Sequence, residues 1–168
     1  MEFSELLDRL RALGAWRLVE ELTATIDRLV ETERLIKFMD SVLRALDRLV
    51  PEYKLDVLGR LEAYVYTEAT PRIAEALVTR AAPERVVPYI TMWMFYEVLR
   101  AYEEYAIARD EESRQLLKWK IERYAEWLKR CAKEYPSLTA RGLLLFVDAI
   151  DYVVKVIGDE IARFGRPL

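Results

Sequence analysis

The stretch Leu143–Ile157, LLLFVDAIDYVVKVI, is the most apolar part of this 168-residue chain. Only Asp148, Asp151 and Lys155 interrupt it, so apolar side chains cover most of the circumference of the helix that it predicts. A helix of this kind is usually central and packed by several neighbours. We therefore expect it to lie at the centre of the fold, within a long C-terminal helix that Ser137 caps.

The N-terminal third also follows a helical period, and no strand-like alternation occurs in the chain. Ser4 is expected to cap a short helix that ends at Gly14, a residue suited to the left-handed position after a helix. The apolar positions from Ala15 to Val50 then recur at three- and four-residue steps. They predict either one long helix or two helices that meet near Thr32.

Proline and aspartate divide the remainder of the chain after Pro51. Two helices are expected first, one over residues 54–67 and one from Thr70-Pro71 to residue 80. A third starts between Glu84 and Pro88 and runs to residue 108. A fourth, capped by Asp110, covers residues 111–134, and the C-terminal helix follows Tyr135-Pro136. The total is seven or eight helices with short connections. The sequence therefore predicts a single all-α domain over residues 1–168, a multi-helix bundle or stacked helical hairpins without a sheet.

The composition narrows the possible chemistry. The chain has no histidine, no asparagine, one glutamine and one cysteine, Cys131. Imidazole is the commonest general base and metal ligand, and Cys131 continues an apolar stripe with no imidazole to activate it. No phosphate-binding glycine loop, nucleophile elbow or Cys/His cluster is present. We therefore expect no cofactor and favour a non-catalytic protein.

The same composition indicates the kind of organism and the cellular compartment in which we expect the protein. Few amide side chains and many charged ones are typical of hyperthermophiles, so we expect a hyperthermophilic, archaeal source. The acidic N-terminus resembles no signal peptide, no apolar stretch is long enough to cross a bilayer, and one cysteine allows no internal disulfide. We expect a cytoplasmic protein without membrane contact. A net charge of −3 gives no general attraction to nucleic acid.

A run of large side chains covers every face of the helix expected to end at residue 108. Its aromatic residues form two stripes, one of Tyr89, Trp93 and Tyr96 and one of Phe95, Tyr102 and Tyr105. Aromatic residues and methionine are favoured at the centres of interfaces. Packing inside the chain is slightly favoured for this run of side chains, and contact with a protein partner or a second copy of the chain stays open. The interface candidates are Tyr89, Trp93, Tyr96, Tyr102 and Tyr105.

A basic segment with interleaved aromatic residues occupies residues 114–133, with seven basic and two acidic side chains. Trp119, Arg123 and Trp127 recur every fourth residue, so Arg123 is placed to stack between two indoles. The candidate nucleic-acid residues are Arg114, Lys118, Trp119, Arg123, Trp127, Lys129, Arg130 and Lys133. We favour the alternative that the acidic helix before residue 110 neutralises this segment through ion pairs across a hairpin.

Asp148 and Asp151 form a weaker candidate site. Their i,i+3 spacing places two carboxylates near one helix face, as a metal site or an acid–base pair requires. No further carboxylate motif accompanies them, and Lys155 lies one turn after Asp151 as an ion-pair partner. We favour a solvated stripe over a metal site.

Three functions follow in order of preference. The first is a non-catalytic helical interaction protein, such as a subunit, adaptor or assembly factor, that binds a protein partner or self-associates through the aromatic helix face. The second is a nucleic-acid-associated helical subunit that uses residues 114–133. The third is a carboxylate-dependent metalloenzyme around Asp148 and Asp151.

Overall fold

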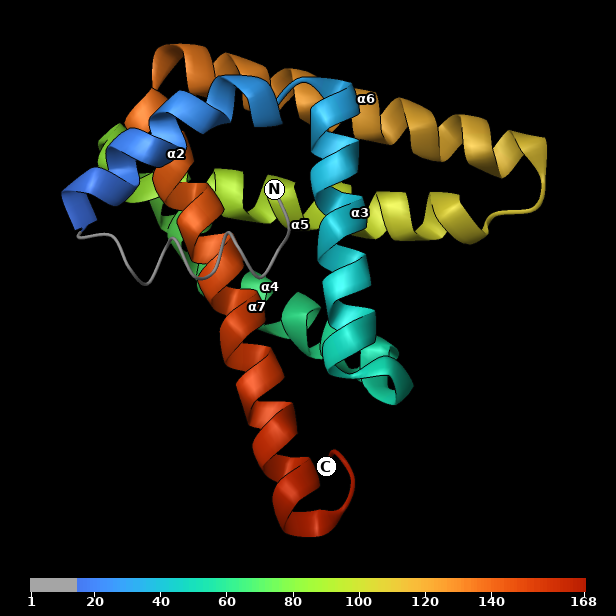
Figure 1. Ribbon diagram of the computed structural model, residues 1–168. Coiled ribbons are helices and arrows are strands. Elements are labelled where there is room, and N and C mark those ends of the chain that lie inside the picture. The colour runs from blue at the N-terminus through green and yellow to red at the C-terminus, as the bar shows by residue number, and fades with distance from the viewer. Residues whose placement is uncertain (1–14) are drawn as a thin grey trace.

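The computed structural model describes residues 15–168 and is helical almost throughout (Figure 1). Its elements are α2 (Ala15–Leu29), α3 (Thr32–Leu49), the 3-10 turn η1 (Pro51–Tyr53), α4 (Lys54–Thr79), α5 (Pro83–Ile107), α6 (Glu111–Glu134) and α7 (Pro136–Phe164). The predicted all-α class is confirmed. These residues form six α-helices rather than the seven or eight expected for the whole chain, and the short helix expected to end at Gly14 lies outside the described residues.

One continuous helix, α4, replaces the two helices predicted over residues 54–67 and 71–80. Thr70-Pro71 does not start a helix, because Pro71 lies inside α4. The proline ring removes one backbone donor from the helix and weakens it locally. The buried inner face of α4, which includes Val65 and Ala69, holds the helix in place up to Pro71. Tertiary packing has therefore overridden a local stop signal.

Other helix boundaries agree with the sequence more closely. The segment from Ala15 to Leu49 forms two helices, α2 and α3, and α3 begins at Thr32 as one of the two alternatives predicted. The residue before it, Glu31, makes no capping hydrogen bond with its side chain. α5 begins at Pro83, one residue before the expected range. α7 begins at Pro136, so Ser137 lies inside the helix and the predicted Ser137 cap is wrong. The proline at the first helical position starts this helix instead.

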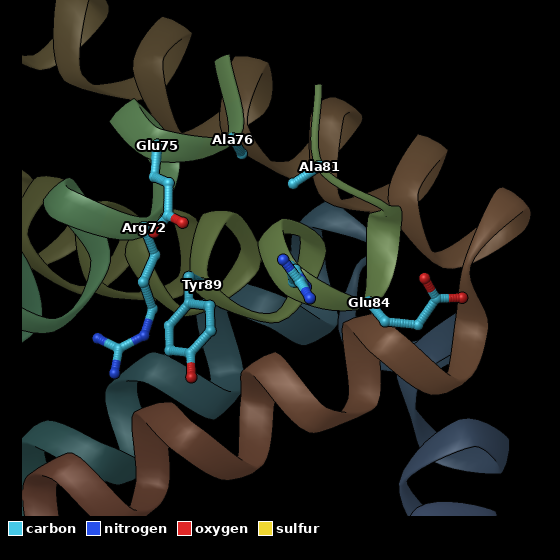
Figure 2. Close-up of a pocket in the computed structure, with 7 residues that line it drawn as sticks. Arg72, Glu75, Ala76, Ala81, Glu84 and Tyr89 are labelled. Carbon is cyan, nitrogen blue, oxygen red and sulfur yellow. The ribbon is translucent and has the colours of Figure 1, made fainter. Parts of the chain in front are cut away.

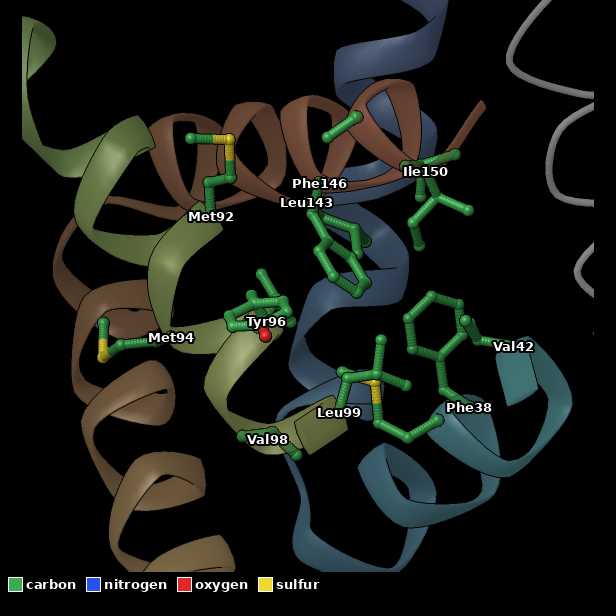
Figure 3. Packing of buried hydrophobic residues seen from close by; sticks show 14 of the residues in the cluster. Phe38, Val42, Met92, Met94, Tyr96, Val98, Leu99, Leu143, Phe146 and Ile150 are labelled. Atoms are coloured by element: carbon green, nitrogen blue, oxygen red, sulfur yellow. The ribbon is translucent and has the colours of Figure 1, made fainter. Parts of the chain in front are cut away.

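Two crossing helices, α5 and α7, form the centre of the fold. α5 also packs against α4 and α6, and α7 packs against α2 and α4. The rings of Phe95 and Phe146 are fully buried at the crossing, with their centroids 6.1 Å apart. Figure 3 shows Phe146 of α7 among the buried side chains that α5 and α3 contribute, including Leu99 and Phe38. The central position predicted for the C-terminal helix is therefore confirmed, but α7 shares it with α5.

A glycine on α7 packs directly against α5. A Cβ atom on Gly142 of α7 would lie 1.7 Å from Oγ1 of Thr91 and 2.8 Å from the carbonyl oxygen of Pro88. Thr91 is fully buried, and its hydroxyl donates to the carbonyl of Val87 in its own helix. Only glycine at position 142 lets the two backbones approach this closely.

The helices α5 and α6 form an antiparallel hairpin that extends to one side of the molecule (Figure 1). Its turn is fixed by Asp110, whose carboxylate accepts a hydrogen bond of 2.7 Å from the backbone amide of Ser113. The predicted cap is thus confirmed. Among residues 15–168, no helix combines the length and the hydropathy needed to span a bilayer.

The Asp110 cap predicts a pH-dependent contribution to stability. The hydrogen bond from the Ser113 amide lowers the pKa of Asp110 below its ordinary value of 3.8. A carboxyl whose pKa is lowered on folding stabilises the protein above its unfolded pKa, and this contribution is lost as the pH falls through the folded pKa. We expect Asp110→Ala to be less stable than the parent at neutral pH, and the difference in stability to shrink as the pH falls below 3.8. Urea unfolding at neutral pH and at a series of acidic pH values measures this, and a difference that does not shrink in acid would contradict it.

Candidate binding surface on helix α6

The apolar pattern of α6 decides which of its side chains face solvent. Leu117, Ile121, Ala125, Leu128 and Ala132 are buried against the rest of the molecule. Because these residues occupy one face of the helix, the tryptophans and most of the basic residues are turned outward. The predicted nucleic-acid segment is therefore on the surface.

Three residues on this surface form what we name the Trp–Arg–Trp stripe: Trp119, Arg123 and Trp127. The guanidinium carbon of Arg123 lies 5.8 Å from the ring centroid of Trp119 and 5.8 Å from that of Trp127. This confirms the predicted placement of the arginine between two indoles, at a distance where cation–π attraction operates. Trp119 is 56% exposed and Trp127 is 37% exposed, so both indoles present ring surface to solvent.

An aromatic ladder attaches the stripe to α5. The ring of Trp127 meets that of Tyr124 edge to face at 5.4 Å, and Tyr124 meets Trp93 of α5 in the same way at 5.7 Å. Burial raises the pKa of Tyr124, so its hydroxyl stays neutral over the physiological range. Edge-to-face pairs of this kind restrict ring motion and stabilise the contact. Trp127 is thus packed against Tyr124 on one side while part of its ring stays exposed.

Lysines flank the stripe. Lys118, Lys120, Lys129 and Lys133 are exposed, and none forms an ion pair with any residue in the described part of the chain. Two other predicted members are engaged within the chain. Arg130 pairs with Glu126 at 3.3 Å, and the guanidinium of Arg114 lies 4.7 Å from the ring centroid of Tyr105.

The expected ion pairs across the hairpin are not found between α5 and α6 within residues 15–168. Two acidic residues of α5 contact α4 or their own helix instead. Glu97 accepts a hydrogen bond from the hydroxyl of Tyr66, and Glu104 pairs with Arg100, which also contacts Glu62 of α4. The predicted network of ion pairs across the hairpin is therefore absent from the described residues, and the acidic partners that are seen lie on the side of α5 that faces α4.

The aromatic residues of α5 that the sequence offered as interface candidates are turned into the chain. Tyr96 is buried, and Tyr89, Trp93, Tyr102 and Tyr105 are half-buried. Each half-buried ring has a neighbour: Arg72 lies over Tyr89 at 4.5 Å, Tyr124 contacts Trp93, the hydroxyl of Tyr102 donates to Asp40 at 2.9 Å, and Arg114 lies over Tyr105. This favours packing inside the chain for these five residues, the interpretation that the sequence slightly favoured.

The weak metal candidate gains no further ligand. Asp151 pairs with Lys155 at 3.0 Å, as the sequence suggested, and Asp148 is exposed on the same helix. No group of three or more potential ligands gathers around them or elsewhere in the described residues. Cys131 is half-buried, and burial raises the pKa of its thiol, which favours the unreactive protonated form.

The turn between α4 and α5 borders a hollow of about 380 Å³ that the sequence did not indicate (Figure 2). It is lined by Arg72, Glu75, Ala76, Ala81, Glu84, Arg85 and Tyr89. Two arginines and two glutamates balance each other there, so the hollow selects no charge. A second hollow, of about 420 Å³, lies beside α6 where Lys129 meets the turn between α2 and α3. Both result from chain segments that only the tertiary fold brings together.

Comparison with protein-family models, with curated proteins and with solved structures gave no match to this chain. The function is therefore argued from the α6 surface itself.

Proposed function

We propose that this protein is a non-catalytic helical protein that binds single-stranded nucleic acid on the outer face of α6. The observation that carries the proposal is the Trp–Arg–Trp stripe, in which two exposed indoles flank a guanidinium. Bases stack on aromatic rings whatever their identity, and this contact is the main source of sequence-tolerant binding to single strands. Arginine adds a cation that contacts either a base plane or a phosphate.

The flanking lysines supply the second element of the proposal. Lys118, Lys129 and Lys133 are exposed and have no ion-pair partner within the described residues, so binding a phosphate breaks no existing ion pair. The chain as a whole carries a charge of −3. Attraction must therefore act at short range on this face, and we expect binding that weakens steeply as salt is added.

Binding of a protein partner on the same face is the second candidate function, in the sense of the subunit, adaptor or assembly factor first favoured. Tryptophan and arginine are the residues most enriched at the energetic centres of protein interfaces. The ladder from Trp93 to Trp127 holds one indole in place before any partner binds, which lowers the entropy cost of association. In this candidate function, the aromatic residues of α5 hold the α6 side chains in place and do not themselves contact the partner.

Reversal of selected charges distinguishes binding by the α6 surface from attraction by the overall charge of the protein. We expect the triple variant Lys118→Glu, Arg123→Glu, Lys129→Glu to bind a labelled single-stranded oligonucleotide of about 16 residues at least tenfold more weakly than the parent at low salt. Lys37, Arg163 and Arg166 are also exposed and form no ion pair with any residue in 15–168. Reversing these three changes the net charge equally, and we expect that control to bind like the parent.

Fluorescence anisotropy over a series of salt concentrations measures both the affinity and its salt dependence. Absence of binding at low salt would overturn the proposal. Equal weakening in the α6 variant and in the control would overturn it too, because the attraction would then come from overall charge. A parent that binds no oligonucleotide but gains a protein partner, lost in the α6 variant alone, would favour the second candidate.

A further inference from the structure

The outer face of α4 carries an uncharged stripe along almost its whole length. We name it the α4 stripe; its members are Leu55, Gly59, Ala63, Tyr66, Thr70, Ala74 and Leu77. Their separations of three or four residues place them on one side of the helix. All seven are exposed, and the two leucines at its ends are 77% and 80% exposed.

The stripe differs from an ordinary solvated helix face. One third of the chain is charged, yet none of the seven stripe positions is, and the N-terminal half of the stripe lies on the side of α4 opposite Val57 and Leu61 of the core. Tyr66, at the middle of the stripe, keeps part of its ring exposed while its hydroxyl donates to Glu97 of α5. A helix that packs on one side normally turns polar residues to water on the other. An exposed helix face that is uncharged over this length, with a strongly exposed leucine at each end, is a candidate contact with another macromolecule.

The order of residues along the stripe identifies the partner. Leu55 lies eleven residues before Tyr66 and Leu77 lies eleven residues after it, with small residues at similar distances between them. Two such helices packed antiparallel about a two-fold axis near Tyr66 place leucine against leucine and small residues against small residues. A two-fold interface requires this self-complementarity. We propose that two copies of this chain associate through their α4 stripes in the antiparallel sense.

Charges at the two ends of α4 are complementary in the same arrangement. Glu52 and Asp56 are exposed at its N-terminal end, and Arg80 is exposed just past its C-terminal end. None of the three forms an ion pair with a residue in the described part of the chain, although, after the hydrogen bond to Glu160, the charge of Asp56 helps to raise the pKa of Arg60 one turn further along α4. Antiparallel packing brings the acidic end of each helix to the basic end of the other and also opposes the two helix dipoles. Parallel packing would place like charges together.

The size of the face sets the expected affinity. From residue 55 to residue 77 the helix is about 33 Å long, and one helix face of this length gives an interface at the small end of the specific range. We therefore expect a reversible dimer that dissociates on dilution in the micromolar range. The association uses a surface separate from the Trp–Arg–Trp stripe, so the two proposals succeed or fail independently.

Two glycines offer a matched pair of variants. A Cβ atom meets no other atom within 4 Å at Gly59 on the stripe or at Gly158 on α7, so a side chain can start at either position without a clash, and unfolding curves check that each variant keeps its fold. We expect Gly59→Glu to weaken dimerisation at least tenfold, because it buries a charge in the interface. Gly158→Glu adds the same charge elsewhere and should leave dimerisation unchanged. Sedimentation equilibrium over a dilution series measures both.

Charge exchange tests the orientation. Arg80→Glu is expected to weaken the dimer, and the addition of Glu52→Arg and Asp56→Arg in the same chain is expected to restore it, since these ends meet only across an antiparallel pair. A parent that is monomeric at every concentration overturns the proposal. If Gly59→Glu leaves the dimer intact, the α4 stripe is not the interface. If charge exchange does not restore the dimer, the two helices are not antiparallel.

Discussion

Replacement of Gly142 by alanine is expected to lower the free energy of unfolding by about 3 kcal/mol, the upper part of the range for overpacked cores. The added methyl group would overlap the hydroxyl of Thr91 and crowd the carbonyl of Pro88. Thr91 has little freedom to move, because it is fully buried and its hydroxyl is bonded to Val87. The two central helices, α5 and α7, must therefore separate at the point where both are most tightly packed.

Gly158 provides the control on the same helix. It is exposed, and a methyl group there meets nothing, so Gly158→Ala should raise stability by about 0.5–1 kcal/mol through the loss of glycine's flexibility in the unfolded chain. Urea unfolding of the parent and the two variants measures both changes. If the two alanine variants shift stability in the same direction, the close approach of α5 and α7 at Gly142 is not a feature of the protein.

These two glycines show one limit of inference from sequence. Both lie in the same apolar helix, and a local pattern assigns them the same small cost. Their different roles depend on where α5 crosses α7, which is a property of the packed structure. Local signals did place Asp110 as a cap and the ends of α6, because capping geometry involves only residues within one turn.

The wrong prediction of a helix start at Pro71 also prevented recognition of the α4 stripe from the sequence. Interpreting Thr70-Pro71 as a helix start divided α4 in two, and neither part is long enough to reveal a stripe from Leu55 to Leu77. The proline is exposed on the outer side of α4, and the buried inner side up to Ala69 keeps the helix continuous to that point. The periodicity was present in the sequence, but its meaning depended on a continuity that tertiary packing supplies.

The sequence predicted the outer surface of α6 better than it predicted the contacts of the neighbouring helices. The spacing of Trp119, Arg123 and Trp127 fixes their mutual position on any helix, so their stacking was predictable. The direction in which the acidic residues of α5 point was not, since it depends on α4 and on partners such as Tyr66 and Arg100. Whether a basic face is neutralised is thus a question of helix arrangement rather than of composition.

Removal of both indoles, in the variant Trp119→Ala, Trp127→Ala, is expected to weaken binding of a single strand by about 3 kcal/mol, roughly 150-fold, at a contribution of about 1–3 kcal/mol for each stacked base. The lysines that flank the stripe stay in place, so the slope of log affinity against log salt should change little. A loss of affinity at constant salt slope separates stacking from phosphate contacts.

Leu116 supplies the matched control, because it is 55% exposed on the same outer side of α6 but has no aromatic ring. Leu116→Ala should bind within about twofold of the parent, since exposed aliphatic surface offers a base no stacking partner. Trp127 also packs against Tyr124, so unfolding curves must accompany the titrations. Trp119 has no such aromatic contact among the described residues, and Trp119→Ala alone should cost roughly tenfold in affinity with the fold intact. A Trp119→Ala protein that binds as tightly as the parent would leave the lysines as the source of attraction and remove base stacking from the mechanism.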